Sequence, residues 1–567
     1  MKSPRMPQPH FPPVRMALWL ILCGLTAIIP LGAQGASPLL GGIRGMVKNA
    51  GTGAPLEGMA VQLVSHKNSI RTTVYSDQDG RYEFPKLAAG WYLLRIARPL
   101  EFKPYQRDSV WIEGAGQLDA IALERVTDSE FLPPTSEILA QLTDSEWLFN
   151  LPGTGEEKKI FSNTCGSGCH TYQQSLRNRF DEKGWSLMLD RMTKYSGRLL
   201  LALRTQADAG GGPITAGADA AVLGDGLTPE GRDKIFKFLT RVRGPNSELP
   251  AMKPFPRPRG AATRVIITEY ELPHFDARPH DVVGDAEGNI WYTSNRSPII
   301  GKLDPRTGVV KEYPVPITPG KHSGSHWMDI AKDGTIYFTE TWSNNLGHLD
   351  PRNGEIQKLP GMGGNKGLAP DGFIWGTCGG GYICKFDPKT AKPVQRIPLK
   401  KSKDTYGNFV SPDGKYFAGG DPWNPNFDGI VFLDIGTGEV WEVETPSGHG
   451  DPSRGGFDPD GNAWVGGRGG TISEFVRKTH QVREFVSPTP YVTFYEAKPD
   501  KNGEVWAGAQ RGGRMVRYNP KTDRWIEYVY PEPMSLDWRT WVDNSTNPVT
   551  VWYGEHNGYL VRIQPLE

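Results

Sequence analysis

Between residues 42 and 126, apolar and polar residues alternate over stretches of three to five residues, and turn residues separate these stretches. Such alternation is typical of a β-strand with one face in a core and the other in solvent. Short strands at this spacing predict a small β-sandwich over residues 36–128. The predicted strands cover residues 43–47, 61–63, 81–84 and 91–94.

The pattern changes after Pro133-Pro134, where apolar residues begin to recur at helical spacing. Helices are predicted over residues 135–142, 156–161 and 228–243, the last closing the domain. These segments predict a small α-helical domain over residues 135–245. A Pro-rich linker over residues 246–261 follows it.

The rest of the chain is periodic, because an aromatic residue recurs after a Gly-centred turn. The intervals between successive aromatics are 46, 38, 42, 47, 42 and 46 residues, which matches the length of a four-stranded propeller blade. Residues 262–567 are therefore predicted to form a seven-bladed β-propeller. Its last blade lacks an outer strand, and residues 266–273 have the composition to supply it and close the ring. The recurring aromatics are Trp291, Tyr337, Trp375, Phe417, Trp464, Trp506 and Trp552.

Composition and charge narrow the class of protein. With 68 Gly and 48 Pro among 567 residues, the chain is richer in turn residues than an average protein. Lys and Arg number 64 against 63 Asp and Glu, so the net charge offers no reason to expect nucleic acid as a partner.

The N-terminus has the pattern of an export signal over residues 1–35. Basic residues precede an apolar run over residues 16–31, and small residues follow it up to Gly35. The run is shorter than the roughly 20 residues that span a bilayer, so cleavage near Gly35 is expected and an uncleaved anchor is the alternative. The protein is predicted to be exported, either periplasmic or secreted, with membrane contact only through this segment.

The helical domain contains the sequence Cys165-Gly166-Ser167-Gly168-Cys169-His170. It resembles the haem-attachment sequence of c-type cytochromes, although three residues separate the cysteines here instead of two. The resemblance implies covalent haem c on Cys165 and Cys169, with His170 as an axial ligand. Met192 is the expected second ligand and Met188 its substitute. A structural disulfide between the two cysteines, or a metal site, is the alternative.

The predicted sandwich contains Gly45-Met46-Val47, then Asp79-Gly80-Arg81-Tyr82-Glu83-Phe84, then Gly90-Trp91-Tyr92. These segments resemble the carboxypeptidase regulatory-like domain over about 80 residues. The resemblance implies a prealbumin-like sandwich, also described as a carbohydrate-binding-like fold, and thus a glycan-binding accessory. A structural spacer without a ligand is the alternative.

The propeller repeats contain Gly-Asn-Ile-Trp-Tyr-Thr at residues 288–293 and Ile-Gly-Lys-Leu-Asp-Pro-Arg-Thr-Gly at residues 300–308. They resemble the streptogramin (virginiamycin B) lyase family, whose members eliminate with a His base and hold Mg²⁺ with Glu carboxylates. Here the nearest match to the family's Glu-Pro-His is Arg278-Pro279-His280, which lacks the carboxylate. The resemblance implies lyase chemistry only with a rearranged site.

Side chains at the starts of innermost strands and in the following hairpins meet at one mouth of a propeller channel, where function is usual. His326, His280 and His556 are the candidate catalytic bases, and Glu340 with Glu555 are the candidate ligands of a divalent cation such as Mg²⁺. The alternative for each of these residues is that it is a solvated side chain at the rim of the channel and binds nothing. Candidate ligand-binding residues are Arg454, Arg539, Lys366 and Tyr406.

Cys378 and Cys384 span a predicted hairpin in the third blade. An exported location permits a disulfide between them, and two buried free thiols are the alternative.

The chain is thus predicted to be a mainly β multidomain protein with a prealbumin-like sandwich, a small cytochrome c-like helical domain and a seven-bladed propeller. Its expected function is that of an exported haem c protein that binds a small ligand, glycan or peptide at the propeller mouth and transfers electrons to a redox partner. The alternatives are a lyase and a noncatalytic carbohydrate- or peptide-binding protein. The lyase is the least favoured of the three, because the carboxylates of the lyase family are missing from their expected positions.

Overall fold

The computed structural model describes residues 40–165, 171–192, 229–274, 277–321, 323–340, 342–422, 424 and 426–567. The predicted export signal over residues 1–35 lies outside these residues. The described chain is mainly β, as predicted, with a sandwich, a group of helices and a series of four-stranded sheets. None of the helices in these ranges is long and apolar enough to cross a bilayer.

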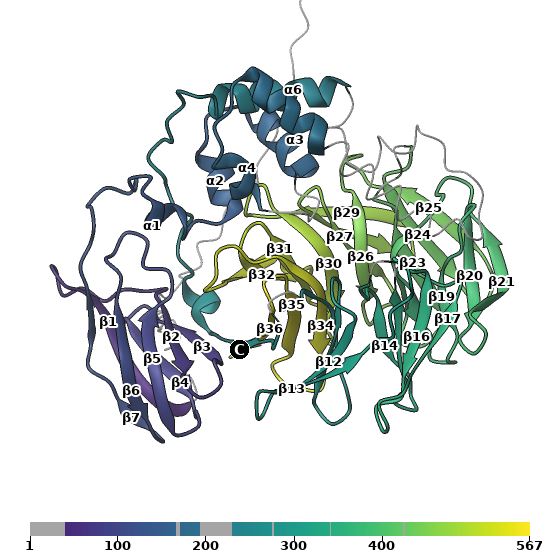
Figure 1. Ribbon diagram of the computed structural model, residues 1–567, viewed down its shortest axis with the longest axis horizontal. Coiled ribbons are helices and arrows are strands. Elements are labelled where there is room, and N and C mark those ends of the chain that lie inside the picture. The colour runs from purple at the N-terminus through teal and green to yellow at the C-terminus, as the bar shows by residue number, and fades with distance from the viewer. Residues whose placement is uncertain are drawn as a thin grey trace, which may run out of the picture. The chain divides into compact units, whose positions relative to one another are not determined.

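Seven antiparallel sheets of four strands follow one another between β9 and β36 (Figure 1). The first strand of each sheet contacts the first strands of the sheets on either side, and this series of contacts closes on itself from the seventh sheet to the first. The arrangement is the predicted seven-bladed propeller, with these first strands lining its centre.

The strands occupy equivalent places in each blade. The innermost strands are β10 (Pro279–Gly284), β14 (Met328–Ile330), β18 (Gly367–Leu368), β22 (Tyr406–Val410), β26 (Pro452–Phe457), β30 (Thr493–Pro499) and β34 (Asp537–Asp543). The second strands are β11 (Ile290–Ser294), β15 (Ile336–Glu340), β19 (Ile374–Thr377), β23 (Tyr416–Gly420), β27 (Ala463–Gly467), β31 (Val505–Gln510) and β35 (Thr550–Glu555). The third strands are β12 (Ile299–Asp304), β16 (Asn345–Leu349), β20 (Tyr382–Asp387), β24 (Gly429–Asp434), β28 (Thr471–Val476), β32 (Arg514–Asn519) and β36 (Tyr559–Pro565). The outermost strands are β13 (Val309–Pro314), β17 (Ile356–Pro360), β21 (Lys392–Pro398), β25 (Val440–Glu444), β29 (Gln481–Val486), β33 (Arg524–Val529) and β9 (Val265–Glu271).

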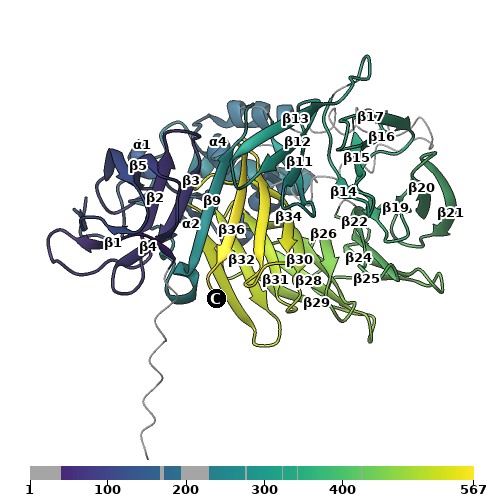
Figure 2. The ribbon, with the colours of Figure 1, turned by 90° about the horizontal axis from the view of Figure 1, so that it is seen from below.

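Ring closure occurs as predicted, because β9 pairs antiparallel with β36 and completes the seventh blade (Figure 2). The sequence did not predict that the other edge of β9 pairs with β3 of the sandwich. Blade and sandwich therefore share one eight-stranded sheet. This pairing satisfies the backbone groups that an outermost strand would otherwise expose.

The sandwich consists of two sheets whose facing residues form its core. One sheet has the order β4-β1-β7 with β8 also on β1, and the other continues from β3 through β2 and β5 to β6. Trp91 and Trp111 are opposite each other on β5 and β6, about half exposed, with ring centroids 5.3 Å apart. The strands are β1 (Gly41–Asn49), β2 (Ala60–Ser65), β3 (Arg71–Tyr75), β4 (Arg81–Pro85), β5 (Gly90–Ile96), β6 (Gln106–Ile112), β7 (Gly116–Gln117) and β8 (Ile121–Leu123).

The helices pack around one apolar core that includes Trp147, Phe161, Trp185 and Phe238. The helix predicted over residues 135–142 is shorter in the structure, where α1 ends at Leu139. A second helix that the sequence did not predict begins at Asp144, and Thr143 caps it through a capping box. The helical elements are α1 (Ser136–Leu139), α2 (Asp144–Asn150), α3 (Gly155–Cys165), α4 (Tyr172–Leu176), a helix over 182–192, α6 (Pro229–Val242) and the 3₁₀ turn η4 (Gly260–Thr263).

Cys378 and Cys384 form a disulfide between the end of β19 and β20, with Cα atoms 5.8 Å apart. Of the two alternatives that the sequence left open, the structure has the bridge.

Glu269 of β9 is buried where the sandwich sheet joins the propeller. Its Oε2 accepts a hydrogen bond of 3.1 Å from Nε2 of Gln62. Burial raises the pKa of Glu269 to about 8, and the nearby Glu532 carboxylate adds to the rise. In an unfolded chain this carboxyl loses its proton at about pH 4.3.

Because the folded protein keeps a proton that the unfolded chain releases, the free energy of unfolding is expected to fall as the pH rises from about 4.3 to about 8. One such group contributes up to about 1.4 kcal/mol per pH unit. Urea unfolding of wild type and Glu269→Gln across this range should show a shallower fall in the variant. An equally steep fall in both proteins would contradict this assignment.

Candidate functional site

The innermost strands, which line the channel, pair irregularly with the second strands, and sequence periodicity does not reveal this. Within the described residues, five of the seven pairings between first and second strands contain a register shift. A bulge places two residues of one strand opposite one of its partner. Adjacent residues such as His280 with Asp281, and Tyr495 with Glu496, therefore both contribute to the centre of the propeller.

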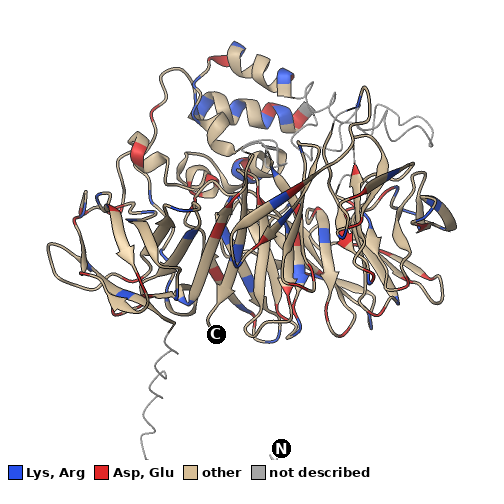
Figure 3. Ribbon diagram, turned by 60° about the horizontal axis from the view of Figure 1, so that its bottom comes forward, with Lys and Arg blue, Asp and Glu red and all other residues tan. Residues whose placement is uncertain are grey.

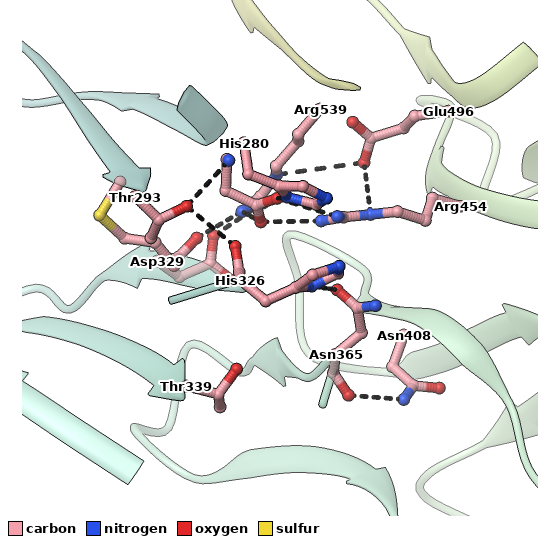
Figure 4. A network of polar contacts seen from close by, with 12 residues as sticks. His280, Thr293, His326, Asp329, Thr339, Asn365, Asn408, Arg454, Glu496 and Arg539 are labelled. Atoms are coloured by element: carbon pink, nitrogen blue, oxygen red, sulfur yellow. Dashed lines mark hydrogen bonds and ion pairs between the residues drawn. The ribbon is translucent and has the colours of Figure 1, made fainter. Parts of the chain in front are cut away.

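Asp281 is the centre of a buried ion-pair network, of which Figure 4 labels Arg454, Arg539 and Glu496. Its carboxylate accepts two hydrogen bonds from Arg454, at 2.9 and 2.8 Å, and one from Arg539 at 3.0 Å. Burial alone would raise the pKa of Asp281, but the two guanidinium groups outweigh it and hold the pKa well below its usual value. Glu496 lies 3.8 Å from Nε of Arg454 and supplies a second carboxylate. The two predicted ligand-binding arginines are thus paired with carboxylates of the protein itself.

Two imidazoles and two phenols lie close together beside this network. The rings of His280 and His326 have centroids 3.9 Å apart. The Tyr495 hydroxyl lies 3.1 Å from Nε2 of His280 and 3.4 Å from Nε2 of His326. The Tyr406 hydroxyl lies 3.1 Å from Nε2 of His326 and hydrogen-bonds the Tyr495 hydroxyl. We call these four residues the His–Tyr cluster.

A single threonine, Thr293, hydrogen-bonds the backbone at or next to both histidines. The Thr293 hydroxyl accepts a 2.9 Å hydrogen bond from the Asp281 backbone N–H and donates one of 3.0 Å to the His326 carbonyl. Thr293 is on β11, so it joins the first blade to the segment that leads into β14 of the second. This contact explains why His280 and His326, which are 46 residues apart in the sequence, lie together.

His556, the third predicted base, is linked to the cluster through Trp538. The Trp538 ring is 4.8 Å from that of His280, and its indole N–H donates to Nδ1 of His556 at 3.2 Å. Burial first, and then the charges of Arg278, Arg296 and Arg511, together lower the pKa of His556 to about 3. His556 is therefore neutral at physiological pH.

The two predicted cation ligands have separate partners. Glu340 is ion-paired with Nζ of Lys358 at 3.0 Å and accepts from Asn345. Glu555 accepts from the backbone N–H groups of Leu536 and Asn557. These contacts give each carboxylate a structural role in its own blade, and no contact in the described ranges joins the two.

Lys366, another predicted ligand-binding residue, is buried rather than exposed at the mouth. Its ammonium donates to the carbonyls of Gly363 and Asn365, at 2.7 and 3.2 Å. Burial lowers the pKa of Lys366 to about 8. Of the four residues predicted to bind a ligand, only Tyr406 lies in the His–Tyr cluster.

A cavity of about 310 Å³ lies within the channel beside the ion-pair network. Arg454, Glu496 and Arg539 line it together with Lys498 and Asp329. The ammonium of Lys498 is 3.3 Å from Oε1 of Glu496. Lys and Arg are interspersed with Asp and Glu over the strands and helices (Figure 3).

The predicted haem-binding residues are only partly described. Cys165 is the last residue of α3, and Cys169 and His170 lie outside the described residues. Met192 is half-buried at the end of the helix over 182–192, and Met188 packs against the helical core. The choice between the two methionines stays a prediction.

Sequence reasoning did not select several residues that complete the site. Asp281 and Trp538 are next in sequence to the selected candidates His280 and Arg539. Tyr495 lies near the start of β30. A rule of one inward residue per strand start misses them, because the bulges turn a second residue inward. Asn365 is likewise next to a selected candidate, Lys366, but it lies in the loop before β18, whose pairing with β19 has no register shift.

Comparisons with known proteins bear on two parts of the chain. Residues 42–122 match the carboxypeptidase regulatory-like domain family, which confirms the resemblance predicted for the sandwich. No curated protein matches the chain.

Among solved structures, streptogramin B lyase is 21% identical, with a TM-score of 0.47, over 54% of this chain and 99% of its own. Virginiamycin B lyase from Staphylococcus aureus is 19% identical, with a TM-score of 0.46, over 53% and 99%. Hydrazine synthase from Kuenenia stuttgartiensis is 13% identical, with a TM-score of 0.42, over 51% and 97%. The chain thus carries a carboxypeptidase regulatory-like domain and is similar in structure to these propeller proteins.

Proposed function

We propose that this chain is an exported, periplasmic or secreted, haem c protein that transfers electrons between its helical domain and a ligand or partner at the propeller mouth. In this proposal Cys165 and Cys169 bind haem covalently and His170 is an axial ligand. Bound haem would supply one-electron chemistry. The propeller supplies the recognition surface around the His–Tyr cluster.

The observation that carries the proposal is a buried contact between the segment after the Cys-His motif and the propeller. Arg511, in the turn between β31 and β32, donates to Asp144 at 3.2 Å, and its guanidinium lies 5.2 Å from the centre of the Tyr172 ring. Tyr172 begins α4, two residues after His170. The Asp144 carboxylate also accepts from the Tyr172 backbone N–H at 2.8 Å.

Arg511 connects this contact to the mouth. Its charge is among those that lower the pKa of His556, and His556 is joined to His280 through Trp538. A haem group attached near Tyr172 would therefore be linked to the His–Tyr cluster through the side chains of Arg511, His556 and Trp538, of which Arg511 is buried and the other two are half-buried.

The helical domain also has a group that fits an anionic cofactor. Arg243 is 2% exposed, and its Nη2 donates to the Arg177 carbonyl at 3.4 Å, whereas its Nε and Nη1 have no hydrogen-bond partner among the described residues. An unpaired buried guanidinium is costly. A haem propionate is an acidic group of the kind that would satisfy it.

A lyase has less support from the same residues. Glu340, its best-placed carboxylate, is neutralised by Lys358, and Glu555 is engaged by backbone N–H groups. A Mg²⁺ ion held by these two residues is therefore not part of the proposal.

Protein produced with haem-maturation machinery is expected to show c-type α and Soret bands that survive acid-acetone extraction, because thioether bonds hold the haem. Cys165→Ser with Cys169→Ser should remove the extraction-resistant haem, whereas Cys378→Ser with Cys384→Ser should not. Colourless wild-type protein from a maturation-competent host would contradict the proposal. Loss of the sulfur-to-iron charge-transfer band in Met192→Ala, with its retention in Met188→Ala, would identify the sixth ligand.

A further inference from the structure

The His–Tyr cluster brings four donor atoms from four different blades to one point. They are Nε2 of His280 and His326 and the hydroxyl oxygens of Tyr406 and Tyr495. Three of the distances between them are 3.1, 3.1 and 3.4 Å. Adjacent ligand atoms about 2.0–2.1 Å from a metal ion are about 2.9 Å apart in a square arrangement and about 3.3 Å apart in a tetrahedral one. The three distances are close to the edges of a four-coordinate site distorted between these two geometries.

The other ring nitrogen of each histidine has an acceptor. Nδ1 of His280 is 2.8 Å from Oδ1 of Asp281, and Nδ1 of His326 is 3.1 Å from Oδ1 of Asn365 (Figure 4). Each of these oxygens can only accept, so Nδ1 carries the proton in both rings and Nε2 keeps its lone pair. A partner on the far nitrogen that fixes the ring and its tautomer is typical of metal-bound histidine.

Burial keeps both imidazoles in the form that binds metal. It lowers the pKa of His280, and it lowers the pKa of His326 well below its usual value with a further contribution from His280. A neutral imidazole is the ligand form, because a protonated ring has no lone pair to donate.

We propose that His280, His326, Tyr406 and Tyr495 bind a transition-metal ion of the Cu(II) or Fe(III) type at the propeller mouth. Asp281 and Asn365 are positioning residues that orient the two imidazoles. Each tyrosine that coordinates does so as a phenolate and releases one proton to solvent.

The donor set separates this site from the magnesium site expected from sequence. Imidazole nitrogen suits copper, iron, zinc and nickel, whereas Mg²⁺ takes carboxylate, carbonyl and water oxygens. Phenolate is an anionic oxygen donor that favours the more highly charged or more acidic of these ions. Because each coordinating phenol gives up a proton, metal binding is expected to strengthen with pH.

The cluster is open on one side and closed on the other. His326 and Tyr406 are half-buried, whereas His280 and Tyr495 are buried. Trp538 covers His280 with its ring 4.8 Å away. An ion could therefore enter, and an exogenous ligand could reach it, from the side of His326.

The proposed metal site is argued from the contacts of these four residues. It rests on the proposed function in one respect only, the transfer of electrons between the metal ion and haem. The two proposals can fail separately. Normal copper binding without a c-type spectrum would remove the haem function and leave this site. A c-type spectrum without copper binding would do the reverse.

The test uses the full chain from a host without haem-maturation machinery, stripped with a chelator and titrated with Cu²⁺. One ion per chain is expected by elemental analysis, with nitrogen hyperfine coupling in the electron paramagnetic resonance spectrum and a phenolate-to-copper absorption band. His326→Gln should weaken binding by more than about 100-fold, because loss of a ligand exceeds the 10–100-fold effect of an outer partner. Tyr495→Phe and Tyr406→Phe, each of which removes only a hydroxyl, should weaken or shift the absorption band.

Tyr337 and His348 provide a matched control, since their rings are 6.1 Å apart on β15 and β16 away from the cluster. Tyr337→Phe with His348→Gln should leave copper binding unchanged. Urea unfolding of every variant shows whether the fold is retained. The proposal is overturned if wild type binds no copper, or if folded His326→Gln and both Tyr→Phe variants bind it with unchanged affinity and spectrum.

Discussion

Replacing Asp281 by Asn is expected to lower the free energy of unfolding by about 3–5 kcal/mol, the usual cost of breaking a buried ion pair from one side. The Asp281 carboxylate is fully buried and neutralises two guanidinium groups at once. An amide at this position supplies one acceptor oxygen and no charge. Arg539 would keep its 2.9 Å ion pair with Asp329, whereas Arg454 would be left with Glu496, 3.8 Å from its Nε.

An exposed pair provides the control for this effect. Asp350 accepts from the Arg352 guanidinium at 2.6 Å at the surface, where the Arg352 side chain is 80% exposed and the Asp350 side chain 28%. Asp350→Asn should therefore cost less than about 1 kcal/mol. Urea unfolding of the two variants measures both effects, and an equal loss in both would show that burial of the Asp281 network contributes nothing.

The propeller was predictable because its repeat is set by local chemistry. Each blade needs a turn and an apolar second strand, and these appear in the sequence as a Gly followed by an aromatic such as Trp291 or Trp464. Closure by β9 was predictable for a related reason, since an unpaired outer strand leaves backbone groups unsatisfied. The further pairing of β9 with β3 was not, because nothing in the alternation of β3 distinguishes a strand with one neighbour from a strand with two.

The centre of the propeller was only partly predictable. His280, His326 and Tyr406 were selected because they lie at strand starts, and the structure brings them together. The arginines were selected for the same reason, but whether an Arg faces a ligand or an Asp depends on which side chain fills the channel. Asp281 fills it, and the bulge that turns it inward is a property of the strand pairing rather than of the residues themselves.

Replacing Trp506 by Ala is expected to lower the free energy of unfolding by about 3–5 kcal/mol, the range for a buried aromatic truncated to Ala. Trp506 is fully buried on β31 and stacks on Tyr528, with ring centroids 5.8 Å apart. Its indole N–H donates to Asp500 at 3.0 Å. The other oxygen of Asp500 accepts from the backbone N–H groups of Asn502 and Glu504, so the Trp side chain also supports the turn.

The same aspartate-to-indole bond joins Asp285 to Trp291 at 2.8 Å and Asp458 to Trp464 at 2.9 Å, so the contact belongs to the blade rather than to one position. Trp111→Ala is the matched control, because the Trp111 side chain is 49% exposed on the sandwich and its loss should cost only about 0.5 kcal/mol. Trp506→Phe keeps most of the apolar volume but leaves Asp500 without its indole donor, and should fall between the two. An equal loss of unfolding free energy in Trp506→Ala and Trp111→Ala would contradict the role of the recurring aromatic in stabilising each blade.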